Sequence, residues 1–289
     1  MPLERSGELV TLRERDACLE IAPRDGGALI SWSLSGRDLL RRRAAGSTDP
    51  LASGCFPLAP FSNLITGGGF FFQGRFHPLA RNHPLEPEPI HGDAWLAAWE
   101  VDVLHGNRAI LSYAHGADWG FPFRYRIVQD ILLRARSLRI GLELTNADRG
   151  AMPAGLGLHP YFHRMPGAQL QAVHGGRWED SRVLPDSRFV VAEPIRNRSM
   201  DVCYVGWSGT AHLVGASAAI TISASPSART LVVYAPESED FVCIEPVTHV
   251  NDGFNAAAAG APEVGVRTLQ PRESMSLKVV ISAQLVGPF

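Results

Sequence analysis

The stretch "SLRIGLELTN", residues 137–146, decides the fold class of this chain. Apolar side chains occupy every second position, at Leu138, Ile140, Leu142 and Leu144, and the positions between them are mostly charged or small. Successive side chains of a β-strand point to opposite faces of the sheet. The pattern therefore predicts a strand with one face in a core and the other toward solvent.

The same alternation recurs along most of the chain, and 28 glycines and 21 prolines supply many short connections. No long amphipathic helix is evident, and only "NAAAAGA", residues 255–261, favours a helical turn or a loop. We therefore expect an all-β protein, built as a large antiparallel sandwich or a partly closed barrel. The further strands that we predict are "AILSYAH" (109–115), "RYRIVQDILL" (124–133), "AAITISA" (218–224), "RTLVVYA" (229–235) and "SMSLKVVIS" (274–282).

Length and charge limit the class of protein. A chain of 289 residues is compatible with one all-β domain over residues 1–289, and no linker divides it. The formal net charge of −2 argues against a nucleic acid or an acidic membrane surface as partner. No run approaches the roughly 18 apolar residues of a membrane span, and the N-terminus lacks an apolar signal core. We expect a soluble, cytoplasmic protein.

The four cysteines, Cys18, Cys55, Cys203 and Cys243, are far apart and form no Cys-x-x-Cys pair. Such spacing fits neither a zinc site nor a redox site, so we expect reduced thiols.

His159 stands out in "GLGLHPYFHR", residues 155–164. It follows an apolar segment that resembles a buried strand, and Pro160 then ends the ladder, as at the rim of a sheet. An isolated buried histidine is usually one that donates to a backbone carbonyl. The neighbouring rings of Tyr161 and Phe162 favour a second interpretation, in which His159 lies in a small-molecule pocket.

Glu245 occupies a similar position in "FVCIEPVTHVNDGFN", residues 241–255, after four apolar residues and before Pro246. A carboxylate there is costly unless it is paired or used. It is either a salt-bridged residue at a strand end or a group whose pKa is set by burial for proton transfer. Asp201, in "SMDVCYVGW" (199–207), taken alone would be a turn residue or a cap.

His91 lies in the proline-rich stretch "HPLEPEPIHGDAWLAAWEV", residues 83–101, which predicts a fixed loop that enters a strand near Trp99. It is either part of a surface loop or a hydrogen-bond donor in the wall of the same pocket. A metal site is a third option, but His77, His83 and His91 have spacings of six and eight residues, which match no zinc template. We expect neither a metal nor a cofactor.

Six segments, in this order, resemble the aldose 1-epimerase (galactose mutarotase) family over nearly the whole chain. The resemblance implies a large antiparallel β-sandwich of the galactose mutarotase type, with a carbohydrate cleft across one sheet. The segments are "PRDGGALISWSLSGRDLL" (23–40), "FPLAPFSNLITGGGFFFQGRFHPL" (56–79), "EPIHGDAW" (88–95), "GLGLHPYF" (155–162), "MDVCYVGW" (200–207) and "CIEPVTHVNDGFN" (243–255).

The resemblance also implies an activity and residue roles: interconversion of the α and β anomers of a free aldose, an isomerase reaction without metal or hydride carrier. His159 would be the general acid at the ring oxygen and Glu245 the general base at the anomeric hydroxyl. His91 would hydrogen-bond the sugar near the reacting atoms, and Asp201 would bind ring hydroxyls.

Three further residues are substrate-binding candidates. Asn63 belongs to the "SN" motif of the resembling segment, and the aromatic rings of Trp95 and Tyr161 could face the C–H groups of a sugar.

The chain departs from the resembling family at Leu64, where relatives carry an arginine that anchors the sugar. Leucine cannot donate a hydrogen bond. Either the substrate lacks the polar group that the arginine would meet, or another donor fills the space, with Arg75 and Arg81 the nearest candidates in sequence.

Two other functions compete with this one. The protein could be a sugar-binding or sugar-sensing protein without catalysis, which the loss of the arginine favours. It could also be a glycoside hydrolase with Glu245 and Asp201 as its two carboxylates, but His159 would then have no necessary role.

Overall fold

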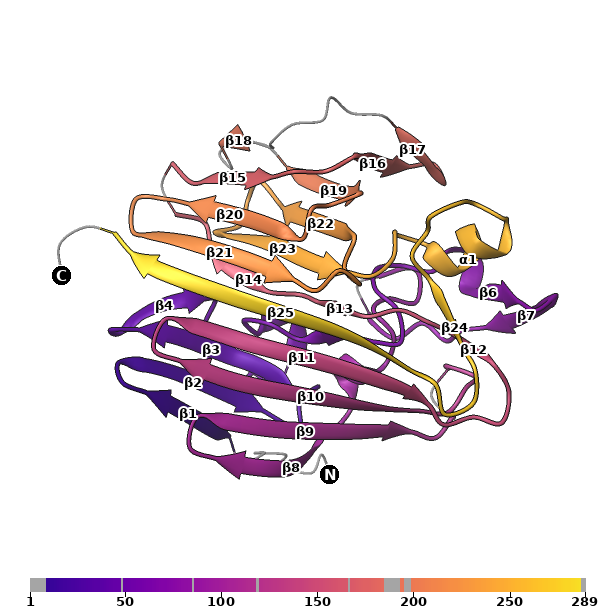
Figure 1. Ribbon diagram of the computed structural model, residues 1–289, viewed down its shortest axis with the longest axis horizontal. Helices are drawn as coiled ribbons and strands as arrows, with labels where there is room; N and C mark the ends of the chain where they lie inside the picture. Colours follow the sequence, from indigo (N-terminus) through magenta and orange to yellow (C-terminus); the bar gives the residue numbers. More distant parts are fainter. Residues whose placement is uncertain are drawn as a thin grey trace.

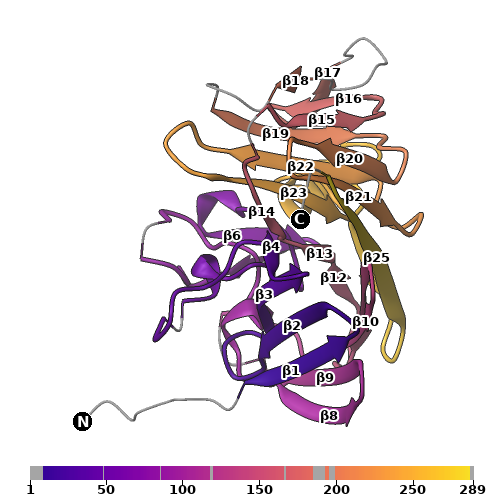
Figure 2. The same ribbon diagram turned by 90° about the vertical axis from the view of Figure 1, so that its left-hand side faces the viewer.

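Two large antiparallel sheets lie face to face in the computed structural model, which describes residues 9–47, 49–84, 86–117, 120–165, 167–184, 193–194 and 199–286 (Figures 1 and 2). The prediction of an all-β antiparallel sandwich is confirmed. Among the described residues, no helix is long and apolar enough to cross a membrane.

The first sheet has 12 strands among the described residues, and the site described below lies on it. In order across the sheet, its path is β1 (Val10–Glu14), β2 (Ala17–Ala22), β3 (Ala28–Leu34), β4 (Arg37–Leu40), β14 (Tyr161–His163), β23 (Phe241–Val247), β22 (Thr230–Ala235), β19 (Met200–Val205), β16 (Gly176–Glu179) and β17 (Arg182–Leu184), with β13 (Gly157–Leu158) and β5 (Pro57–Leu58) paired beside β23.

The second sheet has nine strands in the described part of the chain. In order, they are β18 (Glu193–Pro194), β15 (Gln169–Ala172), β20 (Thr210–Val214), β21 (Ala218–Ala224), β25 (Ser274–Leu285), β11 (Ser137–Asn146), β10 (Tyr125–Arg134), β9 (Arg108–His115) and β8 (Glu100–His105).

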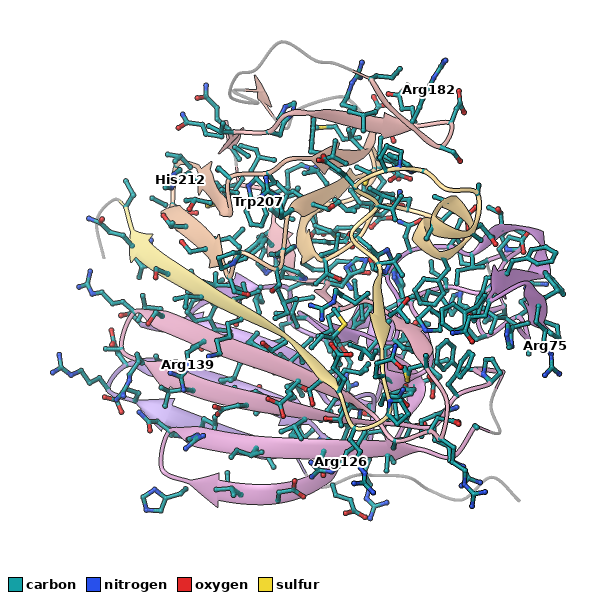
Figure 3. All side chains as sticks on the ribbon, turned by 45° about the vertical axis from the view of Figure 1, so that its right-hand side comes forward. Arg75, Arg126, Arg139, Arg182, Trp207 and His212 are labelled. Atoms are coloured by element: carbon teal, nitrogen blue, oxygen red, sulfur yellow. The ribbon has the colours of Figure 1, made fainter. Side chains whose placement is uncertain are left out.

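The alternation in β11 appears as predicted. Leu138, Ile140, Leu142 and Leu144 are buried, and each lies opposite an apolar residue of β25 in the register, from Ile281 to Met275. Arg139 points to solvent from the other face (Figure 3). Full burial of one such aliphatic side chain contributes about 1.5–3 kcal/mol, so the contact between the sheets stabilises the fold strongly.

Smaller elements complete the described structure. Two further strand pairs lie outside the large sheets: β6 with β7, which form a hairpin, and β12 with β24, which are distant in sequence. The segment from Asn255 lies in a short helix of six residues. Their bounds are β6 (Gly69–Phe72), β7 (Arg75–Pro78), β12 (Met152–Ala154), β24 (Arg267–Leu269), α1 (Gly253–Ala258), and the 3₁₀ turns η1 (Pro50–Ala52), η2 (Thr66–Gly68) and η3 (Ala94–Leu96).

Candidate active site

Strand β23 is buried along its whole length, which explains its continuous apolar sequence. Val242 and Ile244 face the core between the two sheets, whereas Cys243 belongs to a second apolar cluster on the outer face. Because the side-chain period is two, Glu245 is on the same face as Cys243. A carboxyl group is thus placed under the loops that cover this outer face.

The outer face carries a row of residues across four strands. Tyr161 of β14 pairs with Cys243 of β23, Cys243 pairs with Tyr234 of β22, and Tyr234 pairs with Asp201 of β19. Glu245 lies one pleat further along β23, opposite Val232 of β22. The sheet register therefore brings two of the predicted segments, those of Glu245 and Asp201, onto one surface.

His159 lies between β13 and β14, where Pro160 interrupts the ladder as predicted. Its backbone N–H donates to the Phe56 carbonyl (3.0 Å). Its ring packs against both Phe56 and Tyr161, with centroid distances of 4.7 and 4.6 Å, and those two rings lie 6.1 Å from each other. Two flat neighbours leave the imidazole little freedom to rotate, so its nitrogens keep a fixed direction.

The His159 ring meets Glu245, with 3.4 Å between Nε2 and Oε1. Both side chains are buried, and neither Nδ1 of His159 nor Oε2 of Glu245 has a hydrogen-bond partner in the described part of the chain. Buried polar atoms are usually satisfied. Two unpartnered atoms on adjacent ionisable groups are therefore typical of a site that receives a polar ligand.

Burial acts on both members of this pair. It raises the pKa of Glu245 well above its ordinary value, with the charge of Asp201 adding to the rise. It lowers the pKa of His159 well below its ordinary value, helped by His91 and Arg41. The favoured state is a carboxylic acid beside a neutral imidazole, so the pair holds one transferable proton and one basic nitrogen.

His91 stands perpendicular to His159, with ring centroids 5.2 Å apart. Its Nδ1 accepts from the backbone N–H of Asn63 (3.0 Å), and the backbone N–H of His91 donates to the Asn63 carbonyl (3.0 Å). Burial lowers the pKa of His91 to about 3. The ring is therefore neutral with its proton on Nε2, the form that donates a hydrogen bond into the cleft.

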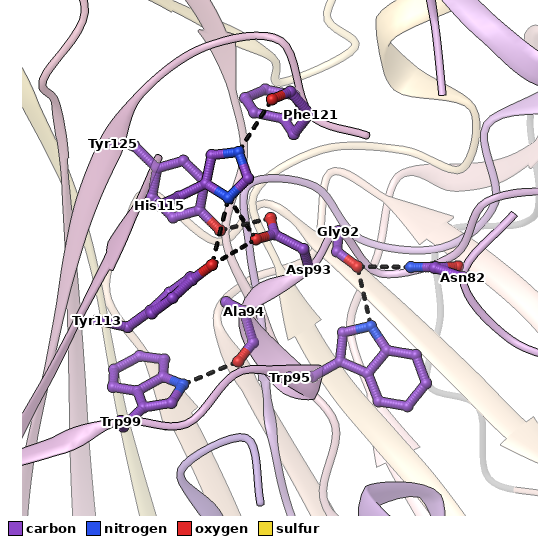
Figure 4. Close-up of polar contacts among 10 residues, drawn as sticks. All are labelled: Asn82, Gly92, Asp93, Ala94, Trp95, Trp99, Tyr113, His115, Phe121 and Tyr125. Atoms are coloured by element: carbon purple, nitrogen blue, oxygen red, sulfur yellow. Dashed lines mark hydrogen bonds and ion pairs between the residues drawn. The ribbon is translucent and has the colours of Figure 1, made fainter. Parts of the chain in front are cut away.

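The loop that carries His91 is anchored from behind by Asp93 (Figure 4). The carboxylate accepts from the hydroxyls of Tyr113 (2.9 Å) and Tyr125 (2.6 Å) and lies 2.7 Å from Nδ1 of His115. Nε2 of His115 donates to the Phe121 carbonyl (2.9 Å). Since a carbonyl can only accept, Nε2 of His115 carries a proton. Three side chains of β9 and β10 thus fix a loop that belongs to the opposite face of the sandwich.

A cleft of about 750 Å³ opens over the His159–Glu245 pair. Asp201 stands exposed at its rim, and partial desolvation together with Glu86 raises the pKa of this carboxyl. The described residues that line it include the predicted site residues Asn63, His91, His159, Tyr161, Asp201 and Glu245, together with Leu64. A larger hollow of about 970 Å³, elsewhere on the molecule, is lined by none of them.

Trp95 does not fit the prediction that it faces the sugar. Its ring is fully buried, lies 5.5 Å from Phe56 in a stacked arrangement, and donates from Nε1 to the Gly92 carbonyl (3.0 Å). It also does not line the cleft. Trp95 therefore supports the His91 loop from beneath, because the turn of η3 directs the ring inward.

Neither arginine considered as a substitute at Leu64 lines the cleft. Arg75 is exposed on β7 and points away from the body of the molecule (Figure 3). Arg81 donates to the carbonyls of His83 (3.1 Å), Pro84 and Glu86. A residue that the sequence did not indicate, Arg41, lines the cleft instead. It follows an ordinary strand, so nothing in its local pattern distinguishes it from the two arginines that come next.

His159, Cys243 and Glu245 each offer one ligand atom, and these atoms lie within 4.8 Å of one another. This is the donor set that zinc accepts. Burial raises the pKa of the Cys243 thiol well above its ordinary value, so a metal would have to displace a firmly held proton.

A family model for aldose 1-epimerase matches residues 8–282. The chain belongs to the aldose 1-epimerase family. The uncharacterized protein YphB of Escherichia coli K12 is 29% identical over 280 residues, which cover 88% of this chain and 93% of that protein.

Solved structures agree on the fold. An Escherichia coli K12 protein, provisionally assigned as an aldose 1-epimerase, gives a TM-score of 0.83 at 26% identity, covering 96% of this chain and 99% of that one. Galactose 1-epimerase from Lactobacillus acidophilus NCFM gives a TM-score of 0.73 at 16% identity, covering 96% and 95%. The second likeness supports the galactose mutarotase type of sandwich alone.

The buried histidines make acid stability testable. Burial lowers the pKa of His159 well below the ordinary value, that of His91 to about 3 and that of His249 to about 4, so all three stay neutral when folded. Below pH 6.5 each of these three histidines binds a proton in the unfolded chain but not in the folded one. Glu245 acts in the opposite direction: its raised pKa lets the folded chain keep a proton that the unfolded chain loses above pH 4.5. The net difference of about two protons should lower the free energy of unfolding by up to about 2.7 kcal/mol per pH unit from pH 6 toward 5.

Urea unfolding at pH 7, 6 and 5 measures this slope. His249→Gln should reduce it by about one proton, whereas His105→Gln, on the exposed strand β8, should leave it unchanged. A free energy of unfolding that is the same at all three pH values would contradict the expectation.

Proposed function

We propose that this protein is a mutarotase that interconverts the α and β anomers of a free aldose. The observation that carries the proposal is the buried pair of His159 and Glu245, 3.4 Å apart at the floor of an open cleft, each with one unpartnered polar atom. Membership of the aldose 1-epimerase family supports the same chemistry.

Anomer exchange requires one base and one acid on a single hemiacetal. Glu245 would take the proton of the C1 hydroxyl while His159 gives a proton to the ring oxygen, and the bond between C1 and that oxygen breaks. The open aldehyde rotates about the C1–C2 bond and closes on its other face, with both proton transfers reversed. No atom or electron pair is left over, and no co-reactant is required.

The protonation state of the pair is compatible with this cycle. The carboxylic acid with a neutral imidazole and the carboxylate with an imidazolium contain the same number of protons. A shift of one proton over the 3.4 Å between Oε1 and Nε2, assisted by the hydroxyls of the bound sugar, converts the first form into the second. His91, neutral and protonated on Nε2, would donate to a sugar oxygen beside the reacting atoms without competing for the transferred proton.

Polarimetry tests this function. Freshly dissolved α-D-glucose, α-D-galactose, D-xylose, L-arabinose and L-fucose should include at least one sugar whose optical rotation equilibrates faster with the protein than in buffer. Dialysis against EDTA should leave the rate unchanged, because the proposed steps use side chains alone; loss of activity that zinc restores would instead point to the ligand set of His159, Cys243 and Glu245.

Acceleration with none of the five sugars would contradict the enzymatic proposal for common aldoses. Calorimetric binding of a sugar without acceleration would then favour a sugar-binding protein. Release of monosaccharide from a disaccharide would favour a hydrolase.

A further inference from the structure

Arg41 is held against the candidate acid by its own backbone and by stacking. Its N–H donates to the Tyr161 carbonyl (2.8 Å), and its guanidinium carbon lies 3.8 Å from the centroid of the Tyr161 ring. The same carbon lies 4.8 Å from the ring centroid of Phe241. Tyr161 also stacks on His159, so one ring at the wall of the cleft contacts both the guanidinium and the candidate acid.

The hydrogen bonding of this guanidinium is incomplete. Both of its hydrogen bonds come from Nη2, to the carbonyls of Leu51 and Ser53, the second at 3.0 Å. Nε is buried and has no partner, and no described carboxylate forms an ion pair with the group. A guanidinium carries five N–H donors, and a half-buried charge without a counterion is costly. A ligand with oxygen acceptors would accept hydrogen bonds from these N–H groups and so reduce that cost.

The other charges of the cleft limit what that ligand can be. Arg41 is the only arginine or lysine among the described residues that line it. Asp49, Glu86, Asp201 and Glu239 line it as well, in addition to Glu245. A bound phosphate or sugar carboxylate would be attracted by one cation, Arg41, and repelled by several carboxylates. Sugar hydroxyls can accept from Arg41 and donate to the carboxylates at once.

We propose that Arg41 is a substrate-binding residue that donates hydrogen bonds to the oxygens of an uncharged sugar, and that the carboxylates around it exclude sugars bearing a phosphate or carboxylate. The inference rests on the proposed function in that it takes the ligand of the cleft to be a sugar. Arg41 would supply the donor that Leu64 cannot, and that Arg75 and Arg81 are not placed to supply.

Isothermal titration calorimetry with the five sugars named above tests the inference on the wild type, Arg41→Met and Arg41→Lys. For the sugar that binds the wild type most tightly, Arg41→Met should raise Kd by about ten- to a hundred-fold, the loss expected for hydrogen bonds from a charged donor. Arg41→Lys, which keeps the charge but lacks the planar set of N–H donors of the guanidinium, should give an intermediate Kd. Arg75→Met, an exposed arginine outside the cleft, should bind as the wild type does.

A role limited to holding Leu51 and Ser53 would lower the melting temperature of Arg41→Met and leave the Kd of its folded form unchanged, which would overturn the inference. If Arg41→Met does not fold, Arg41→Lys decides, and a wild-type Kd there counts against it. D-galactose 6-phosphate should bind at least ten-fold more weakly than D-galactose; equal or tighter binding overturns the exclusion of anionic sugars.

Binding and turnover separate the two proposals. A wild type that binds a sugar through Arg41 but does not accelerate anomer exchange contradicts the proposed function and leaves the inference standing. A wild type that accelerates exchange, with Arg41→Met equal to it in both Kd and KM, contradicts the inference alone. Binding of none of the five sugars counts against both.

Discussion

Replacing Glu245 by glutamine should lower kcat for anomer exchange by about 10²-fold or more, and His159→Ala should do the same. Glutamine keeps the size of the side chain but cannot take the C1 hydroxyl proton, and alanine removes the donor to the ring oxygen. The double variant should lose less than the two single losses combined, since both groups act in one step. Polarimetry or exchange NMR on the best substrate gives all three values.

Glu245→Gln should also stabilise the fold, in a manner that depends on pH. Because burial raises the pKa of Glu245, its ionised form is disfavoured in the folded state, and stability is lost as the pH rises above about 4.5, the ordinary value. The amide has no such cost, so the gain in free energy of unfolding should be larger at pH 8 than at pH 5. This trade of stability for activity is common at catalytic groups.

Glu143→Gln is the matched control, because Glu143 is exposed on β11 and faces away from the core. It should change neither turnover nor stability. Near-wild-type turnover in Glu245→Gln or in His159→Ala would refute the acid–base assignment, and a destabilised Glu245→Gln at pH 8 would refute the account of its burial.

Gly92→Ala should lower the free energy of unfolding by about 3 kcal/mol and reduce turnover strongly. Gly92 has φ +70°, and a Cβ there would lie 2.1 Å from the carbonyl oxygen of Ala59. Its own carbonyl also accepts from Trp95 and Asn82. The chain would have to move at the residue next to His91, and a displacement of about 1 Å near reacting atoms can cost roughly 10²-fold in rate.

Gly74→Ala separates the collision from backbone strain. Gly74 has φ +75° and nothing within 4 Å of a Cβ, so alanine there should cost only the strain of the left-handed conformation, about 1–2 kcal/mol. Urea unfolding and turnover of both variants give the comparison. A Gly92→Ala protein as stable and as active as Gly74→Ala would show that the close approach to Ala59 is unimportant.

The positions of strands, and which face of each strand is buried, could be predicted from the sequence because they depend on local alternation. The strand over residues 137–146 coincides with β11, and the interruption at Pro160 separates β13 from β14 as expected. The nearness of His159 to Glu245 could not be predicted from spacing, since 86 positions separate them and the pairing of β13 and β14 with β23 brings them together. The six-segment resemblance, not periodicity, indicated that pair.

Two site features depended on contacts that no local pattern encodes. Trp95 and Tyr161 are both aromatic residues beside a histidine or a loop, but only Tyr161 reaches the cleft, because η3 directs Trp95 inward. Arg41 is one of three consecutive arginines, and its neighbours form ion pairs with Glu20, Asp38 and Asp25. Which of the three faces the cleft depends on the direction of the chain after β4.

The anchoring of the His91 loop by Tyr113, His115 and Tyr125 has a consequence for how the protein matures. The loop that carries His91 is tied to β9 and β10 of one sheet, whereas His159 and Glu245 belong to the other sheet. Neither half of the chain can therefore assemble the site alone. Contacts between such distant segments form late and slowly during folding. The proposed turnover would therefore report on docking of the two sheets, and its recovery after dilution from denaturant should coincide with burial of the core tryptophans rather than precede it.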